Sequence, residues 1–202
     1  MNIRQDLSLI ASLVPERSTA LDIGCGDGSL LKILRERRGV RGYGLEIDPA
    51  DVSRAVADGL SVVQGDADTD LRDYPDEAFD TVILSNSVQT LRHPERAISG
   101  AVRVGRNVIV SFPNFGHWRV RAHLALHGTM PMSRELPTPW YATENIHLCT
   151  IKDFLYLTDN FEMQVREAYR LNQGASPKRF DPSAPFWPNW RAEAALFVLS
   201  RP

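Results

Sequence analysis

The chain has 202 residues, of which 43% are hydrophobic and 24% charged, a composition ordinary for a globular protein with a full core. The formal net charge of −2 argues against a nucleic-acid binder that works through a broad basic field. The two cysteines are too few for a disulfide framework, and no apolar run approaches the roughly 18 residues that cross a bilayer. We therefore expect a single domain over residues 1–202, located in the cytoplasm, with no nucleic-acid or membrane partner.

Helical and extended patterns alternate along the first half of the chain. Apolar residues at helical spacing predict helices over 4–14, 29–37 and 94–104. Short apolar runs predict strands over 19–24, 40–47, 60–65, 79–85 and 107–112. Asp48 is expected to cap a further helix that begins at Pro49 and ends just before Gly59. Because such alternation implies right-handed crossovers, the sequence predicts an α/β three-layer sandwich around a mostly parallel sheet.

After Ser111 the alternation breaks. Residues 112–146 hold four prolines and two tryptophans, and an irregular segment of this length is typical of a lid or a docking surface. Thr150 and Asp153 resemble a capping box for a helix over 151–160. Two closing strands are predicted, over 161–171 and 192–200, with a second irregular stretch between them.

The loop after the first predicted strand is rich in glycine. It reads Gly24-x-Gly26-x-Gly28, and Asp22 stands just before it. At this place the carboxyl edge of a strand meets the start of a helix, and glycines let a ligand touch the backbone. A nicotinamide enzyme is the runner-up for this loop, because the dinucleotide fingerprint needs its third glycine one residue later, where Ser29 stands.

The tighter glycine spacing, the acid before it and the acid Glu46 at the end of the next strand resemble the class I S-adenosylmethionine (SAM) methyltransferases. SAM has no pyrophosphate, but its α-amino group and sulfonium favour a nearby carboxylate. The resemblance implies that Asp22 supports the methionine part, that Glu46 binds the ribose hydroxyls and that Asp66 meets the adenine amino group. The expected ligand-binding residues are Asp22, Gly24, Cys25, Gly26, Gly28, Glu46, Ile47, Asp66, Ala67 and Ser85. Cys25 is interpreted as a small packed residue rather than a nucleophile, because no base stands near it in the sequence.

No catalytic motif stands out. Family members that methylate nitrogen in nucleic acids and proteins carry Asn/Asp-Pro-Pro-aromatic after the fourth strand, where this chain has "SNSVQ". The candidates for a catalytic role are Asn86, His117 and His147, although a lone histidine is more often a structural hydrogen-bonding residue. Arg119 and Arg121 suit a carboxylate substrate, and equally a solvated or partner-facing position. The spacings of histidine and cysteine match no metal motif.

Five aromatic residues lie in the two irregular stretches: Trp140, Tyr141, Phe186, Trp187 and Trp190. Such residues either fill the core under long loops or anchor an interface. We favour contact with a partner or with a second copy of the chain, because two such stretches occur.

Five phrases resemble one family more closely. They are "LDIGCGDGSLL", "GVRGYGLEID", "RVGRNVIVSFPNFGHWRVR", "MPMSRELPTPWY" and "NIHLCTIKDF", and they are similar to the methionine biosynthesis protein MetW family over about residues 3–160 and the final strand. The stretch 171–190 finds no counterpart and is interpreted as a variable insertion. The resemblance implies the class I methyltransferase fold, with seven strands in the order 3-2-1-4-5-7-6 and one of them antiparallel.

The MetW resemblance also implies a role in methionine synthesis beside MetX, the homoserine O-acyltransferase that forms the O-succinyl or O-acetyl ester. Two functions stay open. In the first, the chain binds SAM or S-adenosylhomocysteine and activates MetX, and residues 112–146 form part of the docking surface. In the second, it is a SAM-dependent methyltransferase that acts on a small molecule, and residues 112–146 form a lid. Fold alone does not decide between a binding subunit and an enzyme.

Overall fold

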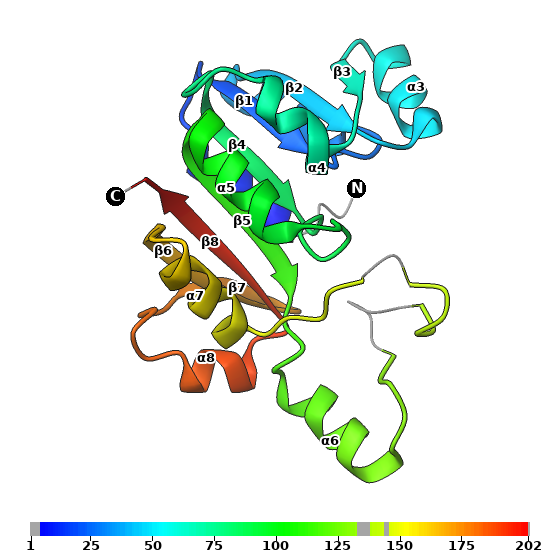
Figure 1. Ribbon diagram of the computed structural model, residues 1–202, viewed down its shortest axis with the longest axis vertical. Helices are drawn as coiled ribbons and strands as arrows, with labels where there is room; N and C mark the ends of the chain where they lie inside the picture. Colours follow the sequence, from blue (N-terminus) through cyan, green and yellow to red (C-terminus); the bar gives the residue numbers. More distant parts are fainter. Residues whose placement is uncertain (1–4, 133–137, 144–145, 202) are drawn as a thin grey trace.

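The computed structural model describes residues 5–132, 138–143 and 146–201. Over these residues the strands form one sheet in the order β3-β2-β1-β4-β5-β8-β6-β7 (Figure 1). The strands are β1 (Thr19–Ile23), β2 (Arg41–Glu46), β3 (Ser61–Gln64), β4 (Phe79–Ser85), β5 (Gly105–Pro113), β6 (Gln164–Asn172), β7 (Ala175–Arg179) and β8 (Ala194–Ser200). The helices are α1 (Gln5–Leu13), α2 (Ser29–Arg38), α3 (Pro49–Ala57), α4 (Ala67–Asp70), the 3-10 turn η1 (Leu71–Asp73), α5 (Pro94–Val104), α6 (Trp118–His127), α7 (Ile151–Asn160) and α8 (Phe186–Arg191). None of these helices is long and apolar enough to cross a membrane.

The predicted mostly parallel α/β sandwich is confirmed, but the predicted count of seven strands is wrong by one. Strands β1 to β5 pair in parallel, and β8 lies antiparallel between β5 and β6, where the family order places its last strand. The additional strand, β7, pairs antiparallel with β6 after a turn at Gly174, whose φ is +69°. Two strands therefore run against the others. The extra strand comes from 171–190, the stretch interpreted as an insertion.

Helices cover both faces of the sheet. On one face, Ile98 of α5 and Phe154 of α7 pack against buried residues of the central strands. The ring of Phe112 on β5 lies 4.9 Å from that of Phe154 and 5.9 Å from that of Phe197 on β8, so three aromatic rings join α7 to the sheet. On the other face, Ile10 of α1 packs with α2 against β1, β4 and β5. This cover on both faces explains why the central strands β1, β4, β5 and β8 read as nearly continuous apolar runs.

Two of the predicted helix starts are present with their capping contacts. The Asp48 side chain accepts a hydrogen bond from the amide of Ala50 at 2.7 Å, and Pro49 begins α3. Thr150 and Asp153 form a complete capping box at α7: the Thr150 hydroxyl accepts from the Asp153 amide, and the Asp153 carboxylate accepts from the Thr150 amide. Local side chains therefore determine where these helices begin.

Replacing Thr150 by alanine is expected to lower the free energy of unfolding by about 1 kcal/mol, because the cap of α7 then loses its side-chain acceptor. For a chain of this size that corresponds to a fall in Tm of roughly 2–4 °C. Thermal unfolding followed by circular dichroism measures it. Thr69→Ala is the control, because Thr69 is an exposed threonine whose hydroxyl bonds only within its own turn. An equal fall in both variants would contradict the role of the cap.

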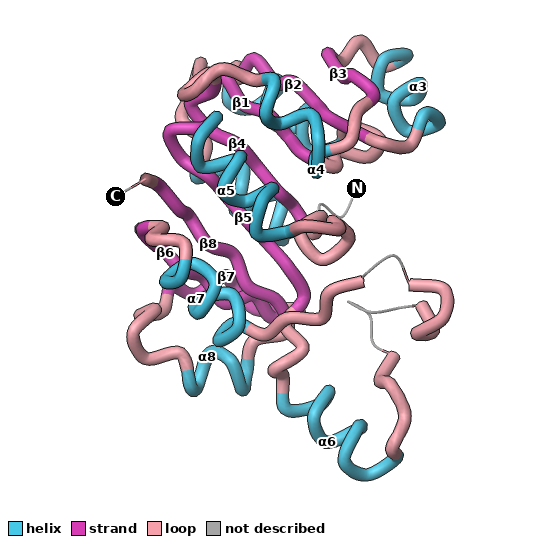
Figure 2. Tube along the Cα trace, in the orientation of Figure 1, coloured by secondary structure: helices cyan, strands magenta, loops and turns pink. Residues whose placement is uncertain are grey.

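Residues 112–146 are not irregular throughout. Strand β5 continues to Pro113, and α6 follows it (Figure 2). The described residues between α6 and α7, which are 128–132, 138–143 and 146–150, form no helix or strand. None of the residues of α6 is buried. A helix that buries no face needs no apolar stripe, so hydrophobic periodicity gave no signal for it. The second stretch expected to be irregular likewise contains β7 and α8.

Candidate ligand pocket at the glycine loop

The three glycines between β1 and α2 have different structural roles. Their φ values of +69° at Gly24, +54° at Gly26 and +75° at Gly28 lie in the left-handed region, which other residues adopt only with strain. A Cβ atom added at Gly24 would lie 2.9 Å from the Cβ of Ser87, and one at Gly28 would lie 2.3 Å from Leu60 Cδ1. Nothing lies within 4 Å of the corresponding position at Gly26. The outer glycines therefore allow close packing, and the middle one faces open space.

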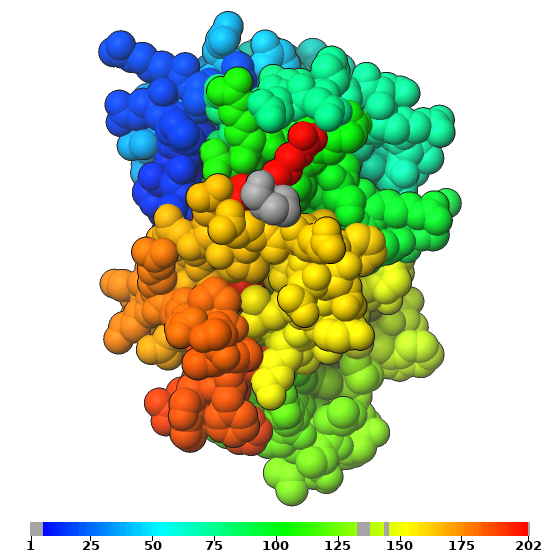
Figure 3. Space-filling model, turned by 60° about the vertical axis from the view of Figure 1, so that its left-hand side comes forward, coloured from blue at the N-terminus to red at the C-terminus, as the bar shows by residue number. Residues whose placement is uncertain are grey.

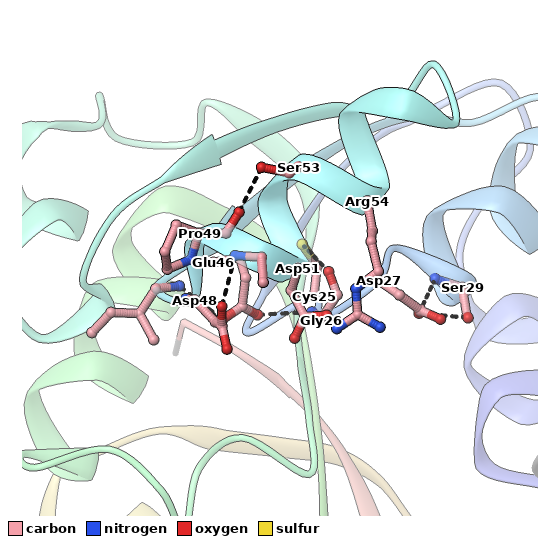
Figure 4. A network of polar contacts seen from close by, with 12 residues as sticks. Cys25, Gly26, Asp27, Ser29, Glu46, Asp48, Pro49, Asp51, Ser53 and Arg54 are labelled. Carbon is pink, nitrogen blue, oxygen red and sulfur yellow. Dashed lines mark hydrogen bonds and ion pairs between the residues drawn. The ribbon is translucent and has the colours of Figure 1, made fainter.

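The carboxylate of Glu46 joins the end of β2 to this loop (Figure 4). Its Oε2 accepts a hydrogen bond from the amide of Gly26 at 2.8 Å. Its Oε1 accepts from the amides of Ile47 at 2.8 Å and Asp48 at 3.0 Å. A carboxylate offers about four acceptor positions, so one remains, on Oε2. A ligand that donates two hydrogen bonds to Glu46 must displace a backbone donor.

Cys25 is buried beside these acids. A Cβ atom added at Gly44 on β2 would lie 2.5 Å from its Sγ, so the thiol fills the space that this glycine leaves. Burial, and then the negative charges of Asp22 and Glu46, raise the pKa of the Cys25 thiol to about 12. The side chain is therefore a protonated packing group near neutral pH, as the sequence interpretation had it.

The other expected pocket residues stand at the carboxyl ends of the parallel strands. Asp22 is buried in β1, and Ser85 ends β4 with its hydroxyl 3.5 Å from that of Ser111. Asp66 caps α4 by accepting from the Asp68 amide at 2.9 Å, and Ala67 is the first residue of that helix. The side chain of Ile47 is exposed next to Glu46.

The three catalytic candidates lie in different surroundings. Asn86 follows β4 with a φ of +58°, and its side-chain amide donates to Asp6 of α1 at 3.3 Å. The ring of His147 lies 3.3 Å from the carbonyl oxygen of Arg92, in the loop after β4. His117 is buried at the start of α6, which lies at the end of the molecule opposite β3 and α3 (Figure 1). The three candidates thus lie in three different segments: after β4, at the start of α6 and before α7.

Burial is the main cause that lowers the pKa of His117 in the folded chain. The unfolded chain then takes up this proton first, near pH 6.5, so stability should be lost as the pH falls below that value. We expect His117→Gln to reduce the dependence of Tm on pH between about 7 and about 5. His127→Gln, at an exposed histidine, is the control. An unchanged pH profile in His117→Gln would contradict this assignment.

Gln89 is a residue of this region that sequence reasoning missed. It is buried in the loop after β4. Its backbone carbonyl oxygen accepts from the amides of Ile146 at 2.9 Å and His147 at 3.0 Å. Its side-chain amide donates to the carbonyl of Pro113 at 3.1 Å and to Sγ of Cys149 at 3.2 Å. Glutamine is usually exposed, so nothing in its sequence context indicated this position. Gln89 attaches the chain before α7 to the loop that packs on Gly24.

The comparison that decides the family covers nearly the whole chain. Residues 4–199 match the family model described as "Methionine biosynthesis protein MetW". The chain belongs to the MetW family. A MetW relative from Rhodopirellula baltica, the "Bifunctional methionine biosynthesis protein MetXA/MetW", is 29% identical over 212 residues, which cover 100% of this chain and 33% of that protein. The chain therefore spans about a third of the length of this curated relative.

Solved structures show how widely this MetW chain shares its fold. An S-adenosylmethionine-dependent methyltransferase from Mesorhizobium loti has a TM-score of 0.70 at 17% identity, with 99% of each chain covered. The (4+2) cyclase SpnF has a TM-score of 0.68 at 17% identity, with 98% of this chain and 81% of that chain covered. At such identities the likeness establishes the fold alone, and proteins of different named activities share it.

Proposed function

We propose that this chain binds SAM or S-adenosylhomocysteine at the glycine loop and, in that form, supports homoserine O-acylation by MetX. The observation that carries the proposal is the fused relative, in which a MetW part is joined to a MetXA part. Fusion holds two partners at a high effective concentration, which is useful when they act together. The ligand would make this MetW-family chain a sensor of the supply of methyl donor.

The residues at the loop fit the proposed nucleoside. Gly26 leaves open space for close approach, and Glu46 keeps one acceptor position for a ribose hydroxyl. Exposed Ile47 offers an apolar contact to a flat base. The buried hydroxyl of Ser87, which packs on Gly24, has no hydrogen-bond partner among the described residues and suits an ammonium donor. When bound, SAM supplies an activated methyl group, whereas S-adenosylhomocysteine supplies none.

Exposed aromatic residues support a partner role. Trp140, Tyr141, Phe186, Trp187 and Trp190 are all exposed, so they do not fill the core. Exposed aromatic rings of this kind often anchor an interface with another protein. This favours the interface reading of the aromatic residues over the core reading.

The proposal is tested by assaying the cognate MetX with homoserine and acyl-coenzyme A, alone, with this chain, and with the chain plus SAM or S-adenosylhomocysteine. We expect the chain to raise the acylation rate several-fold, the nucleoside to change that activation, and light scattering to detect a complex. An unchanged rate together with the absence of a complex would refute the proposal.

A second candidate is methyl transfer to a small molecule. Asn86, a non-glycine residue with φ of +58° at the carboxyl end of β4, favours it, because unusual backbone geometry gathers at active sites. Incubating the chain with methyl-labelled SAM and a metabolite extract tests this function. A labelled small molecule whose formation is lost in Asn86→Ala would support it, and the absence of label would count against it.

A further inference from the structure

Four cationic side chains lie over four aromatic rings at one end of the molecule. The distances from the cation to the ring centroid are 5.4 Å for Arg119 over Trp118, 5.5 Å for Arg121 over Trp190, 5.7 Å for Lys152 over Phe186 and 5.1 Å for Arg191 over Trp187. Within the described residues these are all the contacts of this kind. They come from α6, α8 and the start of α7, which Figure 3 shows side by side as green, orange-red and yellow surfaces.

This surface is both apolar and positive. Phe186 and Trp187 are each 60% exposed, and Leu126 is 80% exposed. Neither Trp118–His127 nor Phe186–Arg191 contains an aspartate or a glutamate, although the whole chain has a net charge of −2. Arg119 forms an ion pair with Glu193, at the long distance of 4.0 Å. Arg121 donates one hydrogen bond, from Nε to the carbonyl oxygen of Gly116 at 2.7 Å, so the arginines keep most of their hydrogen-bonding capacity for other groups.

Buried amides hold this surface in place. The side chain of Asn114 donates to the carbonyl of Asn189 at 2.9 Å and to that of Ala192 at 2.8 Å. Its oxygen accepts from the amide of Gly116 at 2.9 Å, just before α6. The same residue thus fixes the end of α8 and the approach to α6. A surface fixed before binding loses less conformational entropy when a partner arrives.

We propose that this surface, the exposed side chains of Trp118–His127 and Phe186–Arg191, here called the α6–α8 face, binds an acidic face of the acyltransferase partner. The inference rests on the proposed function and specifies the chemistry of its interface. Tryptophan and arginine are the residues that most often dominate binding energy in interfaces. An arginine that lies over a ring can still bind a carboxylate with its planar edge. The partner should therefore present aspartate and glutamate around an apolar centre.

Single-stranded RNA is the competing occupant, because aromatic rings beside cations also stack on bases. The negative overall charge of the chain favours the protein partner, since nucleic-acid binding relies on a wide positive field.

The test measures the Kd of the cognate MetX for the full chain by titration calorimetry at low and moderate salt, about 50 mM and about 300 mM NaCl. We expect Trp187→Ala and Arg191→Glu each to weaken binding at least tenfold, and the wild-type Kd to rise several-fold with salt. Arg72→Glu is the matched control, because Arg72 is an exposed arginine on η1, away from the α6–α8 face, and we expect less than a twofold change there. Circular dichroism and Tm identify any variant that fails to fold.

The outcomes separate the two levels of the proposal. If MetX binds but neither variant nor salt changes its Kd, the α6–α8 face is wrong while the proposed function stands. If no MetX binding occurs with the wild-type chain, the proposed function fails and this inference falls with it. Binding of a labelled oligouridine that is tighter than that of MetX and lost in Trp187→Ala would assign the face to RNA instead.

Discussion

Replacing Glu46 by alanine is expected to weaken the binding of S-adenosylhomocysteine at least tenfold. A hydrogen bond to a charged acceptor contributes about 1.5–3 kcal/mol, and a difference of 1.4 kcal/mol is about tenfold in affinity. The substitution also leaves the amides of Gly26, Ile47 and Asp48 without their acceptor, so the loop itself is expected to lose its fixed shape. Titration calorimetry with S-adenosylhomocysteine gives the change in Kd.

The control for Glu46→Ala is Glu36→Ala, which removes the same charge from an exposed position on α2. Tm is measured for both variants, because an acid that accepts hydrogen bonds from three backbone amides also stabilises the fold. We expect a lower Tm in Glu46→Ala and none of this loss in Glu36→Ala. Unchanged affinity in a folded Glu46→Ala chain would remove Glu46 from the ligand site.

Gly24→Ala and Gly26→Ala form a matched pair with different expected effects. Each puts a side chain on a residue with positive φ, at a cost of about 1–2 kcal/mol. At Gly24 the new methyl group would also lie 2.9 Å from Ser87 Cβ, which is attached directly to the backbone and cannot rotate away. Overpacking of this kind adds about 1–3 kcal/mol. We therefore expect Gly24→Ala to lower Tm by roughly 4–20 °C and Gly26→Ala by roughly 2–8 °C.

Ligand binding should respond differently from stability in this pair. The methyl group of Gly26→Ala points into open space, with no atom within 4 Å. We expect it to weaken S-adenosylhomocysteine binding at least tenfold while the chain keeps most of its Tm. Thermal unfolding and calorimetry on both variants provide the comparison. Full affinity in Gly26→Ala would show that the ligand does not approach the loop from that side.

The features that sequence reasoning predicted correctly leave a signal within a short stretch of the sequence. The strands read as apolar runs because helices cover both of their faces, and α5 was predicted with its observed bounds, Pro94–Val104. Asp48 and Thr150 predict helix starts because their side chains accept hydrogen bonds from amides only two or three residues away. The glycine loop was recognisable because only glycine takes its left-handed turns without strain.

The features that it missed depend on distant contacts. The bonds from Gln89 to Pro113 and Cys149 join residues far apart in the chain, and no local pattern encodes them. The same holds for the side-chain amino group of Asn114, because the two carbonyl oxygens that accept from it belong to Asn189 and Ala192. Strand β7 consists of Ala175–Arg179, a sequence with a proline and two cations that has little strand preference and forms through pairing with β6.

The composition of β7 affects the edge of the sheet that this strand forms. Strand β7 is the outermost strand on its side, and an unprotected outer strand can pair with a strand from another chain. Here Pro177 lacks an amide hydrogen, the pairing with β6 is irregular beside it, and Lys178 and Arg179 add charge. This edge is therefore a poor template for backbone pairing with another chain or for fibre growth. A partner that approaches this edge has to recognise it through side chains.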